Sequence, residues 1–348
     1  MPEKVKVLVT GAGGPAGMGT IRSLMRERWI GVVAADINHL APGLYWAHEK
    51  ALLPPASDKS FLTEIISLCR RLKVDVLFPT VDEEMAIIAQ NHDKVGKAVT
   101  CLIGDTAGVE TCNDKLLTYV VLMKAGIPVV ETRLIADLDS AMLASDVLEY
   151  PVALKPRASR GGRGLSICKD EAEFKEGYLS LVNRLPFTDA YVGVKEASEV
   201  ILQEYLPGTE YDVIVQMDRR DRILACVPMK AMRWDVREQQ REIATEHDKE
   251  VEDLAARTVR ALGLLCPVDV EMAQDRTGRM KILDVNPRVG GDVDLATEAG
   301  CNIPAMHVKL ALGRKVTPCD FDDGLTLVRY VGIQVMRPEE MPRRRKRK

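Results

Sequence analysis

The chain has 348 residues, enough for two or three domains that each bury a hydrophobic core. With 46% hydrophobic and 28% charged residues and a net charge of -3, its composition is that of an ordinary globular protein without the basic excess typical of nucleic-acid binding. Its eight scattered cysteines include no C-x-x-C pair, so we expect reduced thiols in a cytoplasmic protein. No apolar run approaches the ~20 residues that cross a bilayer, so no membrane span is expected. The N-terminus leads directly into a strand, so no signal peptide is expected.

From residue 4 to about residue 100, apolar strand patterns alternate with helix patterns. The expected strands are residues 5–10, 31–36 and 74–79, and the expected helices are residues 20–27 and 60–72, with a turn at 11–19. This alternation is typical of an open parallel sheet with helices on its faces. We therefore expect a Rossmann-like first domain over residues 1–107.

A glycine cluster at residues 11–17 follows the first expected strand, and Asp36 closes the second. This is close to a dinucleotide fingerprint, in which glycines let the backbone approach a pyrophosphate and the acidic residue binds the ribose. The match is imperfect, because Ala16 stands at the third glycine position and Pro15 stiffens the turn. One interpretation is a glycine turn that only closes a strand-to-helix junction. The other is an NAD-linked oxidoreductase that uses Gly11, Gly13 and Asp36.

A second domain is expected over residues 108–318. Asn113 can cap a helix that runs through Leu122 to Ala125. A small α+β lobe is expected over residues 150–206, with strands at 151–155, 165–168 and 200–204 and a helix at 171–183. The rest of the domain is expected to hold strands at 210–217 and 222–229, a helix at 248–262 and a hairpin at 268–286. The last segment, residues 319–348, ends in six basic residues that we expect to form a solvated, disordered tail.

A second glycine-rich turn, residues 159–164, reads Ser-Arg-Gly-Gly-Arg-Gly and lies between two of these strands. Backbone N–H groups of such a flap can fold over phosphates, and Lys155 on the incoming strand would add a positive charge. The simpler interpretation is an exposed hairpin turn.

Further along, residues 200–210 form an apolar strand and a Pro-Gly turn. This is either a plain connector or a hinge that pairs with an adenine edge while Glu210 accepts hydrogen bonds from ribose.

The segment 268–286 alternates apolar and polar side chains on both sides of Thr277 and Gly278, which predicts an antiparallel hairpin. Centring the turn on these two residues places two polar pairs opposite each other, Glu271 with Asp284 and Asp269 with Asn286. One face is then apolar, and the other collects three carboxylates and an amide that repel one another without a cation. Mg²⁺ prefers such oxygen ligands, and Arg288 could meet a phosphate at the same place. The alternative is a half-buried hairpin with a solvated acidic face.

The order of these pieces is more specific than any one of them. Along the chain come Asn113-Asp114-Lys115, Lys155-Pro156, the glycine flap, the Glu-x-Leu-Pro-Gly-x-Glu hinge, Glu271 and Asp284-x-Asn286-Pro287-Arg288. This order resembles the ATP-grasp superfamily, with the nearest likeness to the ATP-grasp halves of the carbamoyl phosphate synthase large chain and their stand-alone relatives. The resemblance covers nearly the whole chain. It implies an α/β and α+β fold, in which a Rossmann-like pre-ATP-grasp domain precedes a two-lobed ATP-grasp fold, and it implies that the glycine cluster at residue 11 borders an acceptor-substrate site.

The resemblance also implies a role for each motif residue. The implied ATP-binding set is Lys115, Lys155, Arg160, Gly161, Gly162, Arg163, Gly164, Gln203, Glu204, Leu206 and Glu210. In this set the lysines and the flap would contact the phosphates. The backbone groups of Gln203 and Leu206, beside Glu204, would bind adenine. The carboxylate of Glu210 would bind the ribose. The implied ligands for Mg²⁺ or Mn²⁺ are Glu271, Asp284 and Asn286. Arg288, together with Lys155, would be catalytic by stabilising the transferring phosphoryl group.

Two positions depart from the synthase pattern, because Glu271 stands where the synthase has Gln and Asp284 stands where it has Glu. The number of oxygen ligands is preserved. The synthase also needs two fused halves and a glutaminase partner, and this chain matches one half. Carbamoyl phosphate synthesis is therefore not expected.

The implied activity is an ADP-forming ligase of the class that makes C–N bonds. A substrate carboxylate would be phosphorylated by ATP to an acyl phosphate, from which an amine, or a thiol, displaces phosphate. The expected partners are a small carboxylate and an amine, and a homodimer is plausible. Substrate contacts are expected from loops, although each of these residues is equally well explained as solvated: Thr80, Asp82, Glu83, Arg233, Arg237, Gly290, Gly291 and Asp292. The alternatives are the NAD-linked oxidoreductase and a non-catalytic, ATP-binding regulatory protein.

Overall fold

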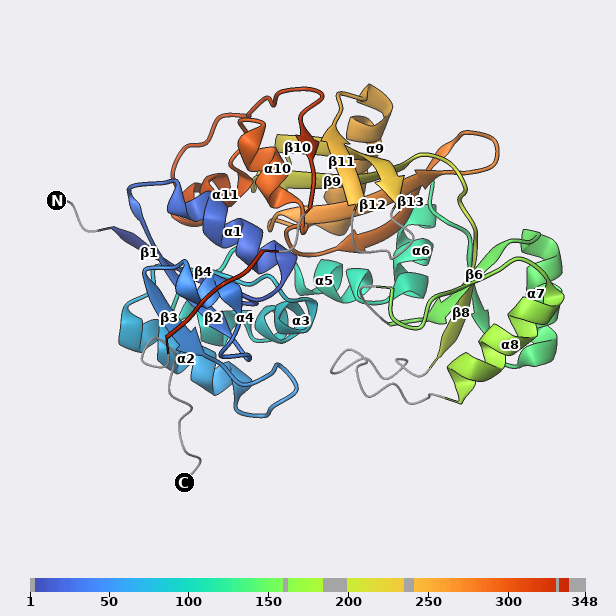
Figure 1. The fold of residues 1–348 in the computed structure, drawn as a ribbon, viewed down its shortest axis with the longest axis horizontal. Coiled ribbons are helices and arrows are strands. Elements are labelled where there is room, and N and C mark those ends of the chain that lie inside the picture. The colour runs from blue at the N-terminus through green and yellow to red at the C-terminus, as the bar shows by residue number, and fades with distance from the viewer. Residues whose placement is uncertain (1–3, 159–161, 184–198, 235–240, 330–331, 338–348) are drawn as a thin grey trace. The chain divides into compact units, whose positions relative to one another are not determined.

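The computed structural model describes residues 4–158, 162–183, 199–234, 241–329 and 332–337 (Figure 1). The chain divides into two compact units. Unit 1 comprises Met1–Val109, Tyr211–Asp269 and Asn286–Lys348, and unit 2 comprises Glu110–Glu210 and Val270–Val285. Among the helices of the described ranges, none has the length and hydrophobicity needed to cross a membrane.

Unit 1 opens with a parallel sheet of four strands in the order β3-β2-β1-β4. These strands are β1 Val5–Val9, β2 Ile30–Asp36, β3 Glu49–Leu52 and β4 Val76–Phe78. The helices of this region are α1 Pro15–Met25, η1 Pro42–Tyr45, α2 Phe61–Leu72, α3 Asp82–Gln90, α4 His92–Gly96 and α5 Thr106–Cys112. The predicted parallel sheet is confirmed, and its central strands are buried, as expected of apolar runs covered by helices.

Helix α1 begins at Pro15, inside the segment predicted to be a turn. Proline suits the first turn of a helix, because no N–H is needed there. The helix also packs very close to the preceding turn, since a Cβ at Gly17 would lie 2.1 Å from the carbonyl oxygen of Gly11. The predicted turn at 11–19 was therefore too long, and one of its glycines serves the packing of the helix.

The rest of unit 1 is built around antiparallel strands. These are β9 Glu210–Met217, whose first residue belongs to unit 2, β10 Ile223–Trp234, β11 Arg241–Thr245 and β14 Thr326–Leu327. The accompanying helices are α9 Lys249–Leu262, α10 Val293–Glu298 and α11 Ile303–Ala311. The pairing of β9 with β10 sets Tyr211 beside Lys230, and β10 in turn pairs with β11.

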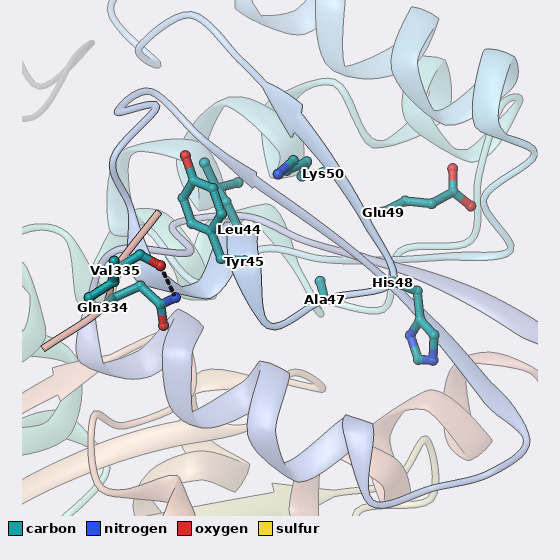
Figure 2. Close-up of a pocket in the computed structure, with 8 residues that line it drawn as sticks. All are labelled: Leu44, Tyr45, Ala47, His48, Glu49, Lys50, Gln334 and Val335. Atoms are coloured by element: carbon teal, nitrogen blue, oxygen red, sulfur yellow. Dashed lines mark hydrogen bonds between the residues drawn. The ribbon is translucent and has the colours of Figure 1, made fainter. Parts of the chain in front are cut away.

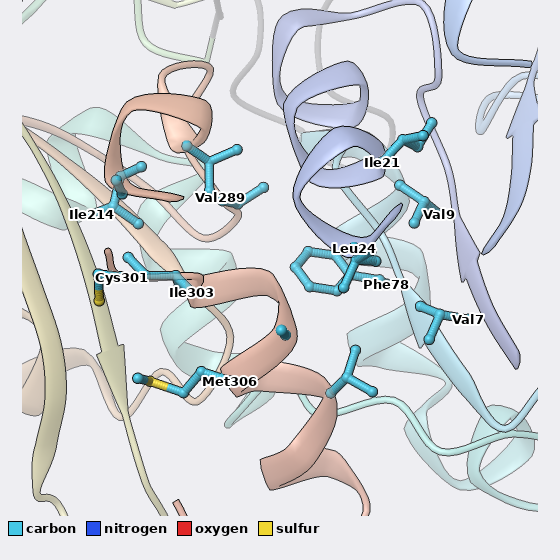
Figure 3. Close-up of a cluster of buried hydrophobic side chains, with 14 of the residues drawn as sticks. Val7, Val9, Ile21, Leu24, Phe78, Ile214, Val289, Cys301, Ile303 and Met306 are labelled. Atoms are coloured by element: carbon cyan, nitrogen blue, oxygen red, sulfur yellow. The ribbon is translucent and has the colours of Figure 1, made fainter. Parts of the chain in front are cut away.

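One hydrophobic core joins the two sheets of unit 1 (Figure 3). From the parallel sheet and α1 it takes Val7, Val9, Ile21, Leu24 and Phe78. From the second half of the unit it takes Ile214, Val289, Ile303 and Met306. Residues that are far apart in the sequence are thus buried together, and the loop that follows Asn286 is anchored in this core through Val289.

Unit 2 contains an antiparallel sheet in the order β5-β8-β6-β7. Its elements are α6 Lys115–Lys124, β5 Thr132–Ile135, α7 Leu138–Leu148, β6 Val152–Pro156, β7 Ser166–Cys168, α8 Glu171–Val182 and β8 Val200–Glu204. Val152, Leu154 and Leu202 pack against Phe174 of α8 in the core of this lobe. Because side chains alternate along a strand, Lys155 and Gln203 lie on the opposite face of the sheet.

The predicted hairpin is confirmed as β12 Val268–Gln274 and β13 Met280–Asn286, which are hydrogen-bonded neighbours. Its turn is one residue longer than predicted. The Asp275 N–H donates to the Arg279 carbonyl at 2.9 Å, and Gly278 has a φ of +83°. A three-residue hairpin loop with glycine in the left-handed region accounts for this geometry. Centring the turn on two residues was therefore wrong.

Two further predictions were wrong. The cap of α6 is Asp114 and not Asn113, since the Asp114 carboxylate accepts the N–H groups of Leu116 and Leu117 at 3.1 and 3.0 Å. A carboxylate beside the first N–H groups of a helix satisfies donors that have no partner inside the helix. The cysteines are also not all reduced, because Cys301 and Cys319, with Cα atoms 5.8 Å apart, form a disulfide.

Candidate functional site

Unit 2 brings together four of the predicted site residues from four different elements. Lys115 is the first residue of α6, Lys155 lies in β6, Glu271 in β12 and Asp284 in β13. The Lys115 ammonium forms an ion pair with the Asp284 carboxylate, and the two side chains are only 9% and 16% exposed. Lys155 interacts electrostatically with the other three. Two lysines and two carboxylates thus form one largely buried charged cluster.

The charges of this cluster shift one another's ionisation. Burial lowers the pKa of the Lys155 ammonium to about 8, and Lys115 adds to that shift while Asp284 and Glu271 oppose it. Burial alone would raise the pKa of Asp284, but Lys115 and Lys155 hold it below its usual range. The Asp284 carboxylate is therefore ionised at neutral pH and is available to a cation.

A third basic residue, Arg157, holds the two lysine-bearing elements together. Its guanidinium donates to both oxygens of Asp114, the cap of α6, at 2.8 and 2.6 Å, and the Lys115 N–H donates to the Arg157 carbonyl at 3.2 Å. The end of β6 is thereby fastened to the start of α6. Sequence reasoning missed this residue, although its place two positions after Lys155 was a usable signal.

Gln203 carries an unused hydrogen-bond acceptor on the same sheet face as Lys155. Its side chain is 1% exposed, and its Nε2 donates to the Thr132 hydroxyl at 2.8 Å. That hydroxyl in turn donates to the Val130 carbonyl at 3.1 Å, which fixes the orientation of the amide. The Oε1 atom has no hydrogen-bond partner. A buried acceptor without a donor costs about 1–3 kcal/mol, so this position suits a ligand that donates a hydrogen bond.

The predicted hinge is tightly fastened. Glu204 accepts from the Glu131 N–H at 2.9 Å and from Lys281 Nζ at 2.6 Å, and its own N–H donates to the Glu131 carbonyl at 3.1 Å. Leu206 is buried beside Ala273 of β12. The Glu204 backbone N–H and side chain are therefore committed within the protein. Gln203 lies inside the sheet between β5 and β6, so its side chain and not its backbone is the candidate ligand group.

The turn after the hinge requires glycine. The Gly208 N–H donates to the Gln274 carbonyl at 3.0 Å, and a Cβ at Gly208 would lie 2.6 Å from the Gln274 Cβ. The Pro-Gly turn consequently lies directly against β12. Glu210, the predicted ribose ligand, follows as the first residue of β9 and is partly buried.

Only part of the predicted phosphate flap is described. Arg160 and Gly161 lie outside the described residues, whereas Gly162 and Gly164 both have positive φ, +68° and +76°. The Leu165 N–H donates to the Gly162 carbonyl at 3.1 Å, and Arg163 is exposed. The described part is a glycine turn with an exposed arginine, as predicted for either interpretation of this segment.

Unit 1 holds the remaining residues of the hairpin motif. Arg288 Nη1 donates to the Asp269 carboxylate at 2.7 Å, and the Asn286 amide donates to the same oxygen at 3.3 Å. Arg288 Nε also lies 3.3 Å from Asp82. Burial raises the pKa of Asp269 above its usual range, although Arg288 opposes this. Asp269 and Asn286 are buried, so the solvated acidic face considered from the sequence is not what forms.

Three of the predicted substrate residues, Thr80, Asp82 and Asp292, are buried. The Thr80 hydroxyl donates to the Thr10 carbonyl at 2.8 Å, and Asp292 forms an ion pair with Arg329. A Cβ at Gly290 would lie 2.9 Å from Asp269 Oδ1. Gly291 lies beside Pro15, Glu83 is the second residue of α3, Arg233 lies in β10, and Arg237 is outside the described residues.

Asp36 does not have the surroundings of a ribose ligand. Its Oδ2 accepts the Gly13 N–H at 2.7 Å, and its Oδ1 accepts the Asn38 N–H at 2.7 Å. Both oxygens therefore serve the backbone, and the carboxylate orders the glycine turn. The geometry favours the structural interpretation of this turn over NAD binding.

A small pocket of unit 1, with a volume of about 220 Å³, opens beside β3 and η1 (Figure 2). Its lining residues are Leu44, Tyr45, Ala47, His48, Glu49, Lys50, Gln334 and Val335. Lys50 lies over the Tyr45 ring, 4.3 Å from its centroid. None of the predicted site residues lines this pocket, so it is not the candidate site.

Within the described ranges no three His, Cys, Asp or Glu side chains form a metal-binding group, and the proposed metal set has two carboxylates and an amide.

Comparison with known families agrees with this arrangement. A family model described as "PylC-like, N-terminal domain" matches residues 7–103, and one described as "ATP-grasp in the biosynthetic pathway with Ter operon" matches residues 196–331. The chain carries an ATP-grasp domain. Its glycine cluster and parallel sheet fall in the PylC-like domain, while the hinge and the hairpin fall in the ATP-grasp match.

The chain is similar to the carbamoyl phosphate synthase large chain of Micrococcus luteus, at 23% identity over 309 residues, which are 78% of this chain and 26% of the synthase. The corresponding large chain of Methanobrevibacter smithii is 23% identical over 300 residues, 79% of this chain and 27% of that one. The chain thus spans about a quarter of the length of these relatives.

Solved structures share the fold. One is the biotin carboxylase domain of the Hydrogenobacter thermophilus 2-oxoglutarate carboxylase, in complex with MgADP, ADP and bicarbonate. It matches with a TM-score of 0.71 at 20% identity, and the match covers 91% of this chain and 71% of the carboxylase chain. N5-carboxyaminoimidazole synthetase of Staphylococcus aureus, complexed with ADP, has a TM-score of 0.71 at 19% identity and covers 91% and 79%. The predicted fold class, a Rossmann-like domain followed by an ATP-grasp fold, is confirmed.

Proposed function

We propose that this ATP-grasp protein is an ATP-dependent ligase that activates a small carboxylate as an acyl phosphate and joins it to an amine or a thiol. The observation that carries the proposal is the buried cluster of Lys115, Lys155, Glu271 and Asp284 in unit 2. Two ammonium groups and two carboxylates in a largely buried site are what a metal-bound polyphosphate requires, because the lysines meet phosphate oxygens and the carboxylates meet the ion.

The residues on the sheet face suit a nucleotide. Lys155 and Lys115 would contact the phosphates, and the glycine flap, with Arg163, would cover them. The unused acceptor of Gln203 suits the exocyclic amino group of adenine, beside Glu204 and Leu206. Glu210 is the proposed ribose ligand. A base without that amino group would leave the Gln203 acceptor unsatisfied, so the site is expected to prefer adenine.

The carboxylates suit a divalent ion. The ion pair between the Lys115 ammonium and the Asp284 carboxylate supports a cation at this position. Glu271, Asp284 and Asn286 would hold Mg²⁺ or Mn²⁺, and the bound ion would neutralise charge on the nucleotide phosphates. Asp284 and Asn286 are two residues apart in β13 and therefore point to the same side of that strand.

The chemistry then needs no nucleophile from the protein. A carboxylate oxygen of the substrate attacks the γ-phosphorus of ATP, and the bond from that phosphorus to the β-phosphate oxygen breaks, so that ADP leaves. The nitrogen of the amine next attacks the acyl carbon, the bond to phosphate breaks, and the nitrogen loses a proton. Lys155 and Arg288 would stabilise charge on the transferring group. A homodimer is a further part of the proposal.

The test is a screen of amino acids and small carboxylates for release of ADP and phosphate from Mg-ATP, followed by mass spectrometry of the product. Lys155→Ala and Asp284→Ala should each lower substrate-dependent ADP release by about a hundredfold or more. If either variant keeps that release, the assignment is wrong. Mg-ATP binding without ADP formation against any pair would instead indicate a regulatory protein, and saturable NAD(H) binding without ATP binding would indicate an oxidoreductase.

A further inference from the structure

Asp269 has no assigned role, yet it contacts two residues of the Asn286-Pro287-Arg288 motif at once. One of its oxygens accepts from Arg288 Nη1 at 2.7 Å and from the Asn286 amide at 3.3 Å. Both Asp269 and Asn286 are less than a tenth exposed. A single carboxylate oxygen therefore sets the side-chain positions of the residue before Pro287 and the residue after it.

The arginine is held from a second direction as well. Its Nη1 also donates to the Val289 carbonyl at 3.1 Å, and its Nε lies 3.3 Å from the buried carboxylate of Asp82, the first residue of α3. Asp82 makes the longer contact, and the Oδ1 atom that faces Arg288 has no hydrogen-bond partner. The hydrogen bond to Asp269 is therefore the stronger and more directional of the two contacts.

The backbone around Asp269 preserves this arrangement. A Cβ at Gly290 would lie 2.9 Å from Asp269 Oδ1, so only glycine lets the loop after Arg288 pass so close to the carboxylate. Val289, between them, is buried in the core of unit 1. The loop that bears Arg288 is consequently fixed on both sides of its contact with Asp269.

We propose that Asp269 is a positioning residue of the ligase, which aims Arg288 at the transferring phosphoryl group. This inference rests on the proposed function, because it acts through the role given there to Arg288. A flexible arginine that must be ordered during the reaction loses much of its effect on the barrier, whereas one that is fixed beforehand does not. Asp269 supplies that order without touching either substrate.

The experiment compares two affinities in each variant: that for Mg-ADP alone, and that for Mg-ADP with aluminium fluoride, which mimics the transferring phosphoryl group. Asp269→Ala should weaken binding of the mimic about ten- to a hundredfold and leave Mg-ADP binding within about threefold, because only the mimic depends on Arg288. Asp269→Asn keeps the size of the side chain and one acceptor oxygen, so it should lose less than about fivefold. The Asp269→Asn variant also tests the proposal if Asp269→Ala does not fold.

Two further variants separate positioning from stability. Combining Asp269→Ala with Arg288→Ala should weaken binding of the mimic no more than Arg288→Ala alone, because both changes remove the same interaction. Asp218→Ala is the control, since it removes another buried aspartate of unit 1 that pairs with an arginine, here the exposed Arg222 at 2.7 Å, and it should leave binding of the mimic unchanged.

The possible results are distinguishable. The positioning role is overturned if Asp269→Ala binds the mimic as the wild type does, if Asp269→Asn loses as much as Asp269→Ala, or if the losses in the double variant add. If the wild type binds the mimic no more tightly than Mg-ADP, and Arg288→Ala changes neither affinity, the proposed function fails and the role of Asp269 with it.

Discussion

His307 makes the folded chain sensitive to acid, and the structure gives the size of the effect. The ring is 2% exposed in α11, packs edge-on against Phe78 with ring centroids 4.9 Å apart, and places Nδ1 3.1 Å from Gln216 Oε1. The Gln216 amide nitrogen already donates to the Met217 and Leu265 carbonyls at 2.8 and 2.9 Å, so its oxygen must accept from the ring. His307 is therefore held neutral, with its proton on Nδ1.

Burial lowers the pKa of His307 from 6.5 to about 3. The folded protein leaves the ring neutral between these values, whereas the unfolded chain protonates it as the pH falls below 6.5. The unfolded state thus gains protons, so the contribution of His307 to stability is complete above pH 6.5 and is lost progressively between pH 6.5 and 3. At pH 5 the loss is about 2 kcal/mol, because each pH unit below the unfolded pKa is worth about 1.4 kcal/mol.

The perturbation is His307→Gln, which keeps a donor for Gln216 and removes the titration. Urea unfolding of both proteins should show that the wild type loses about 2 kcal/mol more than the variant between about pH 8 and pH 5. His247→Gln is the control of opposite sign. A hydrogen bond with Glu252 raises the pKa of His247, so its contribution is present below pH 6.5 and fades as the pH rises. Curves for His307→Gln that run parallel to the wild type at every pH would refute the reasoning, as would an NMR titration midpoint of His307 near 6.5.

The other predictions concern unit 2. Arg157→Ala removes the tie to Asp114 and should lower Mg-ATP affinity about tenfold, measured by calorimetry; an unchanged affinity would show that the lysines are placed without it. Gln203→Met removes the unsatisfied acceptor, so the variant should discriminate less between ATP and GTP and should unfold at a similar or higher temperature than the wild type. Retained discrimination between the two nucleotides would count against the adenine contact. Gly208→Ala should destabilise the fold by about 1–3 kcal/mol, since its Cβ meets Gln274 at 2.6 Å, and a melting temperature equal to that of the wild type would contradict this.

Patterns that repeat locally were predicted well from the sequence. The apolar run at Val5–Val9 and the period of two on both sides of residue 277 gave the parallel sheet and the hairpin, because burial on one or both faces leaves a regular trace. The exact turn was not predictable in this way. A two-residue loop and a three-residue loop with glycine in the left-handed region are both compatible with Thr277-Gly278, and only the hydrogen bond between Asp275 and Arg279 separates them.

Contacts between distant side chains left no such trace. The link from Arg157 to Asp114 joins residues 43 positions apart, and the disulfide joins Cys301 to Cys319 across 18 positions. Neither contact depends on a period, so the pairing of these residues could not be read from a single sequence, although the place of Arg157 near Lys155 marked it as a candidate. The two interpretations of Asp36 could not be separated for a related reason, because an acidic residue after a strand looks the same in the sequence whether it binds a ribose or the backbone of the neighbouring turn.

The ion pair between Lys115 and Asp284 balances charge in the cluster before any ligand arrives. A cation that binds Asp284 must take the place of an ammonium group, and a phosphate that binds Lys115 must take the place of a carboxylate. Under the proposed function, the cation that binds Asp284 therefore frees Lys115 for the phosphate, and the phosphate that binds Lys115 frees Asp284 for the cation. Thermodynamic linkage makes such a pair of exchanges reciprocal, so the divalent ion and the nucleotide favour each other's binding, and each alone binds more weakly than the two together.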